Sequence, residues 1–311
     1  MEIIESDWEE YDSIFNEPYH IFNRAKFNLL NKSKCEELKF LLFKDKKYRL
    51  GFIGGVRDTY LVSPVSAPFG GFSFLNNDIQ ITQIEQALLL LEEYAKQKGL
   101  IGIKISLPPI IYNETFIAKS LNVFYRSNYT IQNLDLDFYL NLKLMDNYLD
   151  NIWYNAKKNI KISLNHDLEF IKTENEESFI NEVYEVIREN REFKGKPLNM
   201  TLNDILETAK VIDTDFFLVR KNEINVASAI IFHATNSIMY VPFWGDKPGN
   251  IQSKPMNFIS YKVFEYYYNI GKKYIHIGIS TENSVPNYGL CEFKESLGCT
   301  ITPKFTFSKT L

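Results

Sequence analysis

The most restrictive feature of this sequence is a repeat between its two halves. Each half has three apolar runs of strand length joined by short polar turns: LKFLLF, RLGFIGGV and TYLVSPV in the first, TDFFLV, NVASAIIFHA and SIMYVPF in the second. Three such runs in succession are typical of an antiparallel meander. Phe43 aligns with Val219 and Pro64 with Pro242, so the offset is nearly constant and favours a duplication.

The likeness continues beyond the meander. Each copy next has a helical pattern, at about residues 81–98 and 256–270, followed by Gly99 and Gly271, where helix C-caps usually lie. A further strand (LIGIKIS, KYIHIGIS) and a further helix (YNETFIAKSLNVF, GLCEFKESLG) follow. A helix between two strands favours a parallel pair, whereas the meander is antiparallel. The sequence therefore predicts an α+β fold of two tandem units, each a mixed, mostly antiparallel sheet flanked by helices.

The length agrees with two units. A chain of 311 residues exceeds one ordinary core and suits two domains of about 150 residues each. We expect the boundary in or near NLKLMDNYLDN, which gives an N-terminal domain at residues 1–148 and a C-terminal domain at residues 149–311.

Composition excludes several classes of protein. With 45% hydrophobic and 24% charged residues, the chain has the composition of a soluble globular protein, and its net charge of −4 gives no general attraction to nucleic acid or anionic membranes. The N-terminal MEIIESDWEEYD lacks the order of a signal peptide, and no run approaches the roughly 18 apolar residues of a membrane span. The cysteines form no CxxC pair and the histidines no HxH or HxxxH pair, so no metal site is expected. We expect a cytoplasmic monomer or homodimer.

The order of elements resembles the GCN5-related N-acetyltransferase (GNAT) fold. Two copies in tandem, with WYNAKKNIKISLNHDLEF, ENREFKGKPL and PNYGLCEFKESLG in the second, resemble the Fem family of peptidoglycan bridge-forming aminoacyltransferases and their acyltransferase relatives. The resemblance covers most of the chain, at fold level in the first half and at motif level in the second. It implies that the C-terminal domain holds the acyl donor and that the N-terminal domain binds the acceptor or serves as a scaffold.

Two departures from these families leave the donor open. No heptad stretch is long enough for the coiled-coil arm of several bridge-forming members, and the Q/RxxGxG/A signature of acetyl-CoA enzymes is replaced by GDKPGNIQSKP. The expected co-substrate is therefore either acyl-CoA or aminoacyl-tRNA, and no tightly bound cofactor is expected.

The loop GDKPGNIQSKP leads into a helix, whose first backbone N–H groups suit a phosphate. Its glycines allow a close approach of the backbone, and its lysines add positive charge, although a solvated surface loop remains the alternative. The candidate donor-binding residues are Gly245, Lys247, Gly249, Lys254 and Asn257.

The resemblance carries a transfer role onto Phe293 and Lys294, in the short helix of PNYGLCEFKESLG. In this fold the donor carbonyl lies where the strands MYVPFW and IHIGIS separate, so Lys294 is expected to stabilise either the oxyanion of a tetrahedral intermediate or a departing phosphate-linked group. From spacing alone, a lysine on a solvated helix face is the simpler interpretation.

Other polar and aromatic residues follow the same elements. ENREFKGKPLNM is basic and ends a helix, so its cations either shape a substrate groove or complement the negative end of the helix. The candidate substrate-binding residues are Arg191, Lys196, Tyr240, Trp244, Asn287 and Tyr288.

The function expected is transfer of an acyl or aminoacyl group to an amine acceptor, a small molecule or a cell-envelope or polysaccharide precursor. The alternatives are a CoA-dependent N-acetyltransferase of a nucleotide-linked amino sugar or small amine, and a catalytically inactive protein that binds a ligand or partner.

Overall fold

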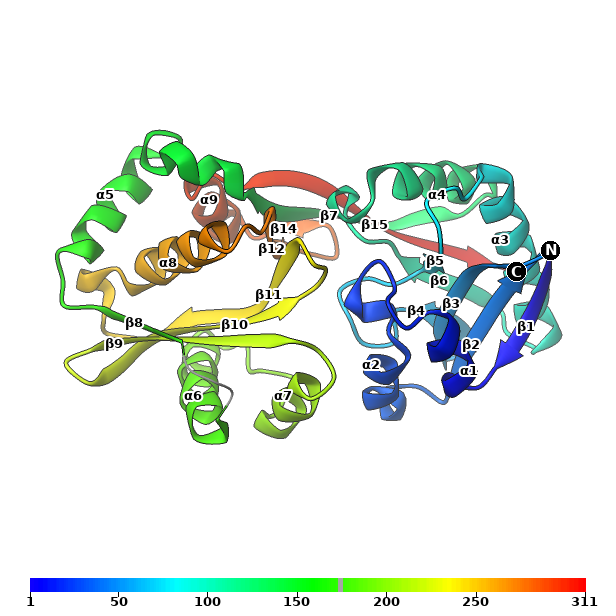
Figure 1. Ribbon diagram of the computed structural model, residues 1–311, viewed down its shortest axis with the longest axis horizontal. Helices are drawn as coiled ribbons and strands as arrows, with labels where there is room; N and C mark the ends of the chain where they lie inside the picture. Colours follow the sequence, from blue (N-terminus) through cyan, green and yellow to red (C-terminus); the bar gives the residue numbers. More distant parts are fainter. Residues whose placement is uncertain (173–175) are drawn as a thin grey trace. The chain divides into compact units, whose positions relative to one another are not determined.

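The computed structural model describes residues 1–172 and 176–311, and the chain packs into two compact units (Figure 1). The first unit contains Met1–Asp137, Thr281–Val285 and Thr302–Leu311, and the second contains Phe138–Ser280 and Pro286–Ile301. The division therefore falls after Asp137 instead of after residue 148, and the end of the chain returns to the first unit instead of staying with residues 149–301. The C-terminal segment belongs to the first unit because residues 306–310 pair with residues 102–106.

The first unit is built on a mixed sheet in the order β1-β2-β3-β4-β6-β15-β7, with β5 paired to β3. All of the pairs with a defined register are antiparallel except β4 with β6. Its strands are β1 (Glu2–Ser6), β2 (Glu37–Lys44), β3 (Tyr48–Arg57), β4 (Tyr60–Ser63), β5 (Phe72–Phe74), β6 (Gly102–Ser106), β7 (Thr130–Asn141) and β15 (Thr300–Thr310). Its helices are α1 (Trp8–Ile14), α2 (Ala25–Leu30), α3 (Ile81–Gln97) and α4 (Glu114–Arg126), with short 3₁₀ turns at Ile21–Asn23, Lys32–Lys34 and Ile110–Tyr112.

Both faces of this sheet are covered, because successive residues of β2 and β3 enter different cores. Leu41 and Phe52 belong to the core that includes residues of α3 and α4, whereas Leu42 and Ile53 pack with Tyr11 of α1. This explains why both strands read as almost continuous apolar runs in the sequence.

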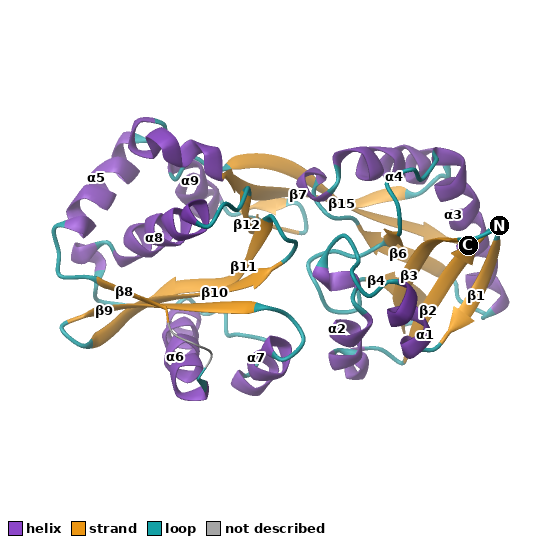
Figure 2. Cartoon of the chain, in the orientation of Figure 1, coloured by secondary structure: helices purple, strands orange, loops and turns teal. Residues whose placement is uncertain are grey.

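The second unit carries the strand order β12-β11-β10-β9-β8. In Figures 1 and 2, α8 lies on one side of these strands and α6 and α7 lie on the other. Its strands are β8 (Glu169–Lys172), β9 (Thr214–Lys221), β10 (Ile224–His233), β11 (Ile238–Asp246) and β12 (Tyr274–Ile279), and the chain continues into the short pair β13 (Thr281–Glu282) and β14 (Val285–Pro286). Its helices are α5 (Tyr154–Leu164), α6 (Glu177–Phe193), α7 (Leu202–Ala209), α8 (Pro255–Asn269) and α9 (Tyr288–Ser296), with 3₁₀ segments at Leu142–Asp150 and Ile251–Ser253.

The predicted repeat and fold class are confirmed. In each unit a meander (β2-β3-β4 or β9-β10-β11) is followed by a helix and by a strand parallel to the last strand of the meander. Gly99 and Gly271 follow the helices α3 and α8 with φ of 74° and 75°, a left-handed conformation that glycine adopts without strain.

One buried histidine makes the stability of the first unit depend on pH. His20 is 1% exposed among aromatic rings, and neither of its ring nitrogens has a hydrogen-bond partner in the described part of the chain. Burial lowers its pKa from 6.5 to about 3. Between these two pKa values His20 is protonated in the unfolded chain and neutral in the folded chain. The contribution of neutral His20 to the free energy of unfolding is therefore complete above pH 6.5 and is lost as the pH falls toward 3.

We predict that the free energy of unfolding falls by about 2 kcal/mol between pH 7.5 and pH 5 through His20 alone. Urea denaturation of the natural sequence and of His20→Phe at both pH values measures this difference. The variant should lose less stability on acidification, and an identical loss in both proteins would contradict the assignment.

Candidate functional site

The second unit contains a cavity of about 600 Å³ where two parallel strands separate. Within the described residues, β11 pairs with β12 from Ile238 and Tyr274 to Tyr240 and His276. Beyond these residues both strands continue, and each contributes to the cavity wall. We call this space the splay cavity; it is lined by Asn190, Arg191, Lys194, Lys196, Tyr240, Val241, Pro242, Trp244, Gly245, Met256, Ile277, Gly278, Ile279, Asn287, Gly289, Leu290, Phe293 and Lys294.

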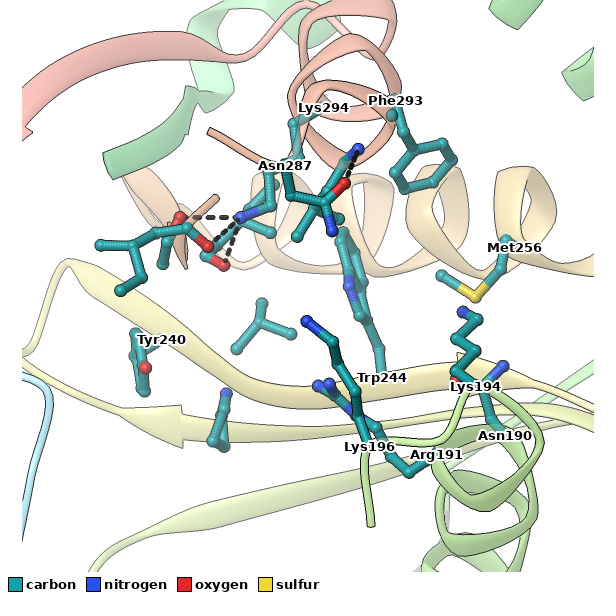
Figure 3. Close-up of a pocket in the computed structure, with 18 residues that line it drawn as sticks. Asn190, Arg191, Lys194, Lys196, Tyr240, Trp244, Met256, Asn287, Phe293 and Lys294 are labelled. Atoms are coloured by element: carbon teal, nitrogen blue, oxygen red, sulfur yellow. Dashed lines mark hydrogen bonds between the residues drawn. The ribbon is translucent and has the colours of Figure 1, made fainter. Parts of the chain in front are cut away.

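The walls of the splay cavity differ in chemistry. Figure 3 shows Arg191, Lys194 and Lys196 at the end of α6 and in the segment after it, across from Asn287, Phe293 and Lys294 of the α9 segment. Trp244 of β11 stands between these two groups, with its ring centroid 6.4 Å from that of Phe293. The cavity therefore combines an aromatic surface with a cationic one.

Lys294 lies in the cavity wall and is buried. The simpler interpretation from spacing, a lysine on a solvated helix face, is therefore wrong. The residue is 2% exposed, and its Nζ donates to the carbonyl oxygens of Ile277, Gly278 and Ile279 at 3.2, 2.8 and 3.0 Å. Three acceptors match the three N–H donors of an ammonium group. The same Nζ lies 5.0 Å from the ring centroid of Phe138, a cation–π contact. Lys294 therefore fastens α9 to the end of β12.

Gly278 gives β12 the shape that this contact needs. Successive carbonyls of a regular strand point to opposite sides, so three in a row cannot meet one ammonium group. Gly278 has a φ of 76°, which interrupts the alternation at the point where the three carbonyls converge. A Cβ here would lie 3.6 Å from the Tyr240 ring, so space is available and only the backbone conformation requires glycine.

The turn between β12 and α9 explains the polar residues of this segment. The side chain of Asn287 accepts a hydrogen bond from Leu290 N at 3.1 Å and caps α9, while Asn287 N donates to the Ser280 carbonyl at 2.8 Å. Asn287 thus fixes the direction in which α9 enters the cavity wall. Tyr288, the next residue, is 78% exposed and does not line the cavity.

The end of α6 is held against β11 by a side chain that the sequence analysis missed. Asn190 Nδ2 donates to the Asp246 carbonyl at 2.6 Å, and Gly245 makes room for it, since a Cβ there would lie 2.8 Å from Asn190 Cγ. Burial raises the pKa of the Asp246 carboxyl, and nearby Lys194 opposes that shift. A glycine that follows an aromatic residue inside a strand was the available signal for this close approach.

The glycine loop before α8 lies apart from the splay cavity except for Gly245. Lys247 Nζ is paired with Glu189 at 2.8 Å. Lys254 is the N-cap of α8 with a φ of 51°, and Gly249 has a φ of 90°. Asn257 is buried in the first turn of α8, at 8% exposure. The donor role predicted for these four residues therefore has no support from the cavity wall.

The structure brings most of the other predicted site residues together. Those that line the splay cavity are Arg191, Lys196, Tyr240, Trp244, Gly245, Asn287, Phe293 and Lys294. Lys194, in the basic segment ENREFKGKPLNM, also lines the cavity but was not predicted to be a site residue. No sequence signal beyond a position next to predicted site residues marks Met256, Gly289 and Leu290.

The first unit closes the corresponding space. There β4 and β6 stay paired from Tyr60 and Gly102 to Ser63 and Ile105. Immediately beyond, Gly70 N donates to the Ser106 carbonyl at 2.9 Å, and Gly71 N donates to Ser63 Oγ at 2.9 Å. The two glycines thus fill the position in which the second unit is open, and the duplicated fold has one open splay among the described residues.

No group of histidine, cysteine and acidic side chains with the geometry of a metal site occurs in the described residues. Across the same residues, no helix is both long and apolar enough to cross a membrane.

Comparison with known proteins identifies the fold. No protein-family model matches the sequence, and no curated protein matches it. Among solved structures, a crystal structure of FemX is similar over 100% of this chain and 98% of that chain, with a TM-score of 0.74 and 12% identity. L-PGS from Bacillus licheniformis matches over 97% and 92%, with a TM-score of 0.62 and 14% identity. A tandem GNAT protein from the clavulanic acid biosynthesis pathway matches over 99% and 98%, with a TM-score of 0.54 and 8% identity. The chain therefore has the tandem GNAT-like fold of Fem-type proteins.

We predict that Lys294→Met lowers the free energy of unfolding by about 3 kcal/mol, because it leaves buried carbonyl groups without a donor. Gly278→Ala should cost about 1–2 kcal/mol, since alanine is strained at this φ. Urea denaturation measures both changes. Exposed Lys210→Met is the control, and a Lys294→Met variant as stable as the control would show that the three-carbonyl contact contributes nothing.

Proposed function

We propose that this protein is an acyltransferase that moves an acyl or aminoacyl group from a nucleotide-linked donor in the splay cavity to an amine acceptor. The observation that carries the proposal is the open separation of β11 and β12, lined on one side by α9 and on the other by the cations after α6. The fold likeness to FemX, to L-PGS and to a tandem GNAT protein supports the same class of reaction.

The size and lining of the cavity suit such a donor. A volume of about 600 Å³ is within the usual range for small-molecule sites, and Trp244 and Phe293 offer flat apolar surface to a base or an acyl chain. Positive charge on the facing wall suits the phosphates that acyl-CoA and aminoacyl-tRNA share.

The proposed chemistry is direct attack. The acceptor nitrogen forms a bond to the donor carbonyl carbon, the bond from that carbon to the donor oxygen or sulfur breaks, and the amine proton passes to the leaving atom. This reaction needs no covalent enzyme intermediate, so the demands on the protein are positioning and stabilisation of the oxyanion. Lys294 supplies a fixed positive charge at the wall of the cavity, and through α9 it also positions Phe293.

The contacts of Lys294 favour an ester donor over a CoA thioester. The pantetheine arm of CoA carries amide groups, and an extended amide chain binds a strand edge through backbone groups. At the end of β12, three carbonyls each already accept a hydrogen bond from the Lys294 ammonium, which leaves each oxygen one lone pair for a ligand. An aminoacyl ester of a terminal adenosine does not need these acceptors. The acceptor that the Fem resemblance implies is an amine of a cell-envelope precursor, which we propose to bind on the first unit.

A donor competition tests the proposal. The protein is incubated with acetyl-CoA or with an aminoacylated tRNA, together with an amine-bearing peptidoglycan precursor, and the acylated product is detected by mass spectrometry. We expect product with the aminoacyl ester. Transfer from acetyl-CoA alone would show that the donor is a CoA thioester. The absence of both transfer and binding with either donor would contradict the proposal that this protein is an acyltransferase.

We predict that Trp244→Ala raises the donor Kd at least tenfold, because the cavity loses its central aromatic surface. Isothermal titration with the donor measures the change. Trp153→Ala, which removes an exposed tryptophan outside the cavity lining, is the matched control. An equal Kd for both variants would place the donor elsewhere.

A further inference from the structure

Four of the carboxylates on α6 form ion pairs. Arg188 bonds both Glu185 and Glu192, with closest distances of 2.6 and 2.7 Å. The remaining pairs are Glu182 with Arg220 and Glu189 with Lys247, at 2.7 and 2.8 Å. Arg191 takes part in none of these pairs.

The helical spacing explains why Arg191 forms no ion pair with a carboxylate of its own helix. Side chains that meet on one face of a helix are three or four residues apart. For Arg191 these positions hold Ile187, Arg188, Lys194 and Gly195, and none of these is acidic. Arg191 therefore has no acidic neighbour at these positions of α6, and it lines the splay cavity.

Arg191 is half-buried. Its Nε is out of contact with solvent and has no hydrogen-bond partner among residues 1–172 and 176–311, and burial lowers the pKa of the guanidinium. A buried donor without a partner is costly and rare in folded proteins. A cation that served only to complement the negative end of α6 would gain nothing from this burial. The position is consistent with a ligand that supplies the missing acceptor.

The charge of the cavity wall indicates the chemistry of that ligand. Arg191, Lys194 and Lys196 line the cavity together, and no aspartate or glutamate in the described part of the chain lines it with them. Two carboxylates adjoin residues of the cavity lining in sequence. Asp246 Oδ1 lies 3.3 Å from Asn190 Nδ2, and Glu192 pairs with Arg188. An arginine with a free edge next to two lysines is the usual composition of a phosphate site.

We propose that the end of α6 is a phosphate subsite, in which Arg191, Lys194 and Lys196 bind the phosphate of a nucleotide whose base lies against Trp244. The subsite replaces the glycine loop before α8, where a phosphate was expected from sequence. It rests on the proposed function only in that the nucleotide belongs to the acyl donor.

The test uses adenosine 5′-monophosphate, whose phosphate and base occur in both donor classes. Binding to the full chain is followed by quenching of tryptophan fluorescence, with Trp244→Phe as the control for the cavity tryptophan, and by isothermal titration. We expect Arg191→Gln and Lys194→Gln each to raise the Kd at least tenfold, and Arg191→Lys to recover part of the loss. Lys247→Gln and Lys254→Gln, the matched changes in the glycine loop, should stay within twofold.

Several results would overturn the subsite. These are an unchanged Kd in Arg191→Gln and Lys194→Gln, a loss confined to Lys247→Gln and Lys254→Gln, or no binding of the probe to the natural sequence. Lys194 is exposed, so its variant remains informative even where Arg191→Gln lowers the Tm. Coenzyme A and the trinucleotide CCA, titrated in parallel, show which source of phosphate the subsite prefers.

The subsite and the acyltransferase proposal can fail separately. Binding of the mononucleotide that depends on Arg191, without any acyl transfer, would support the subsite and count against the enzyme. Acyl transfer with a donor Kd that does not change in Arg191→Gln and Lys194→Gln would support the enzyme and count against the subsite.

Discussion

The contact between one ammonium group and three carbonyl groups holds the candidate site in its open form. Two parallel strands that separate leave backbone acceptors without partners, and buried acceptors of this kind are expensive. Lys294 supplies the donors from a neighbouring helix, and Gly278 turns the strand so that the carbonyls converge. In the first unit, backbone groups at the corresponding position find other partners. Gly70 N donates to the Ser106 carbonyl and Gly71 N donates to Ser63 Oγ, and these bonds close the space.

The same contact changes the meaning of a lysine in this position. A lysine on a short helix beside a cavity suggests a group that reaches toward substrate. Here the Lys294 ammonium bonds the end of β12 and fastens α9 to it. Its effect on a reaction therefore combines a fixed charge with the placement of Phe293. Loss of activity on its removal would therefore not by itself identify a catalytic group, and stability has to be measured together with turnover.

Much of the fold could be read from the sequence, because the duplicated alternation of strands and helices is a local pattern. The three-strand meanders, the glycines that end α3 and α8, and the parallel strand after each helix all follow from periodicity and turn chemistry. The burial of Lys294 and the free edge of Arg191 could not be read, since both depend on which distant residues meet them. The phosphate site predicted in the glycine loop before α8 failed for the same reason. The composition of the loop suits a phosphate, but Lys247 is paired with Glu189, which lies 58 positions away in the chain.

The return of β15 to the first unit has a consequence for how this protein can be made. Ser106 of β6 bonds Thr306 of β15 across 200 positions of the chain, so the first sheet joins segments that are far apart in the sequence. During synthesis, the edge of β6 that pairs with β15 stays unpaired until β15, 200 positions later, has left the ribosome. Long-range pairing of this kind is slow. The first half of the sequence thus lacks one strand of its own sheet. An early stop or a cut before β15 would leave an open β6 edge, which is the kind of surface that chaperones and aggregation compete for.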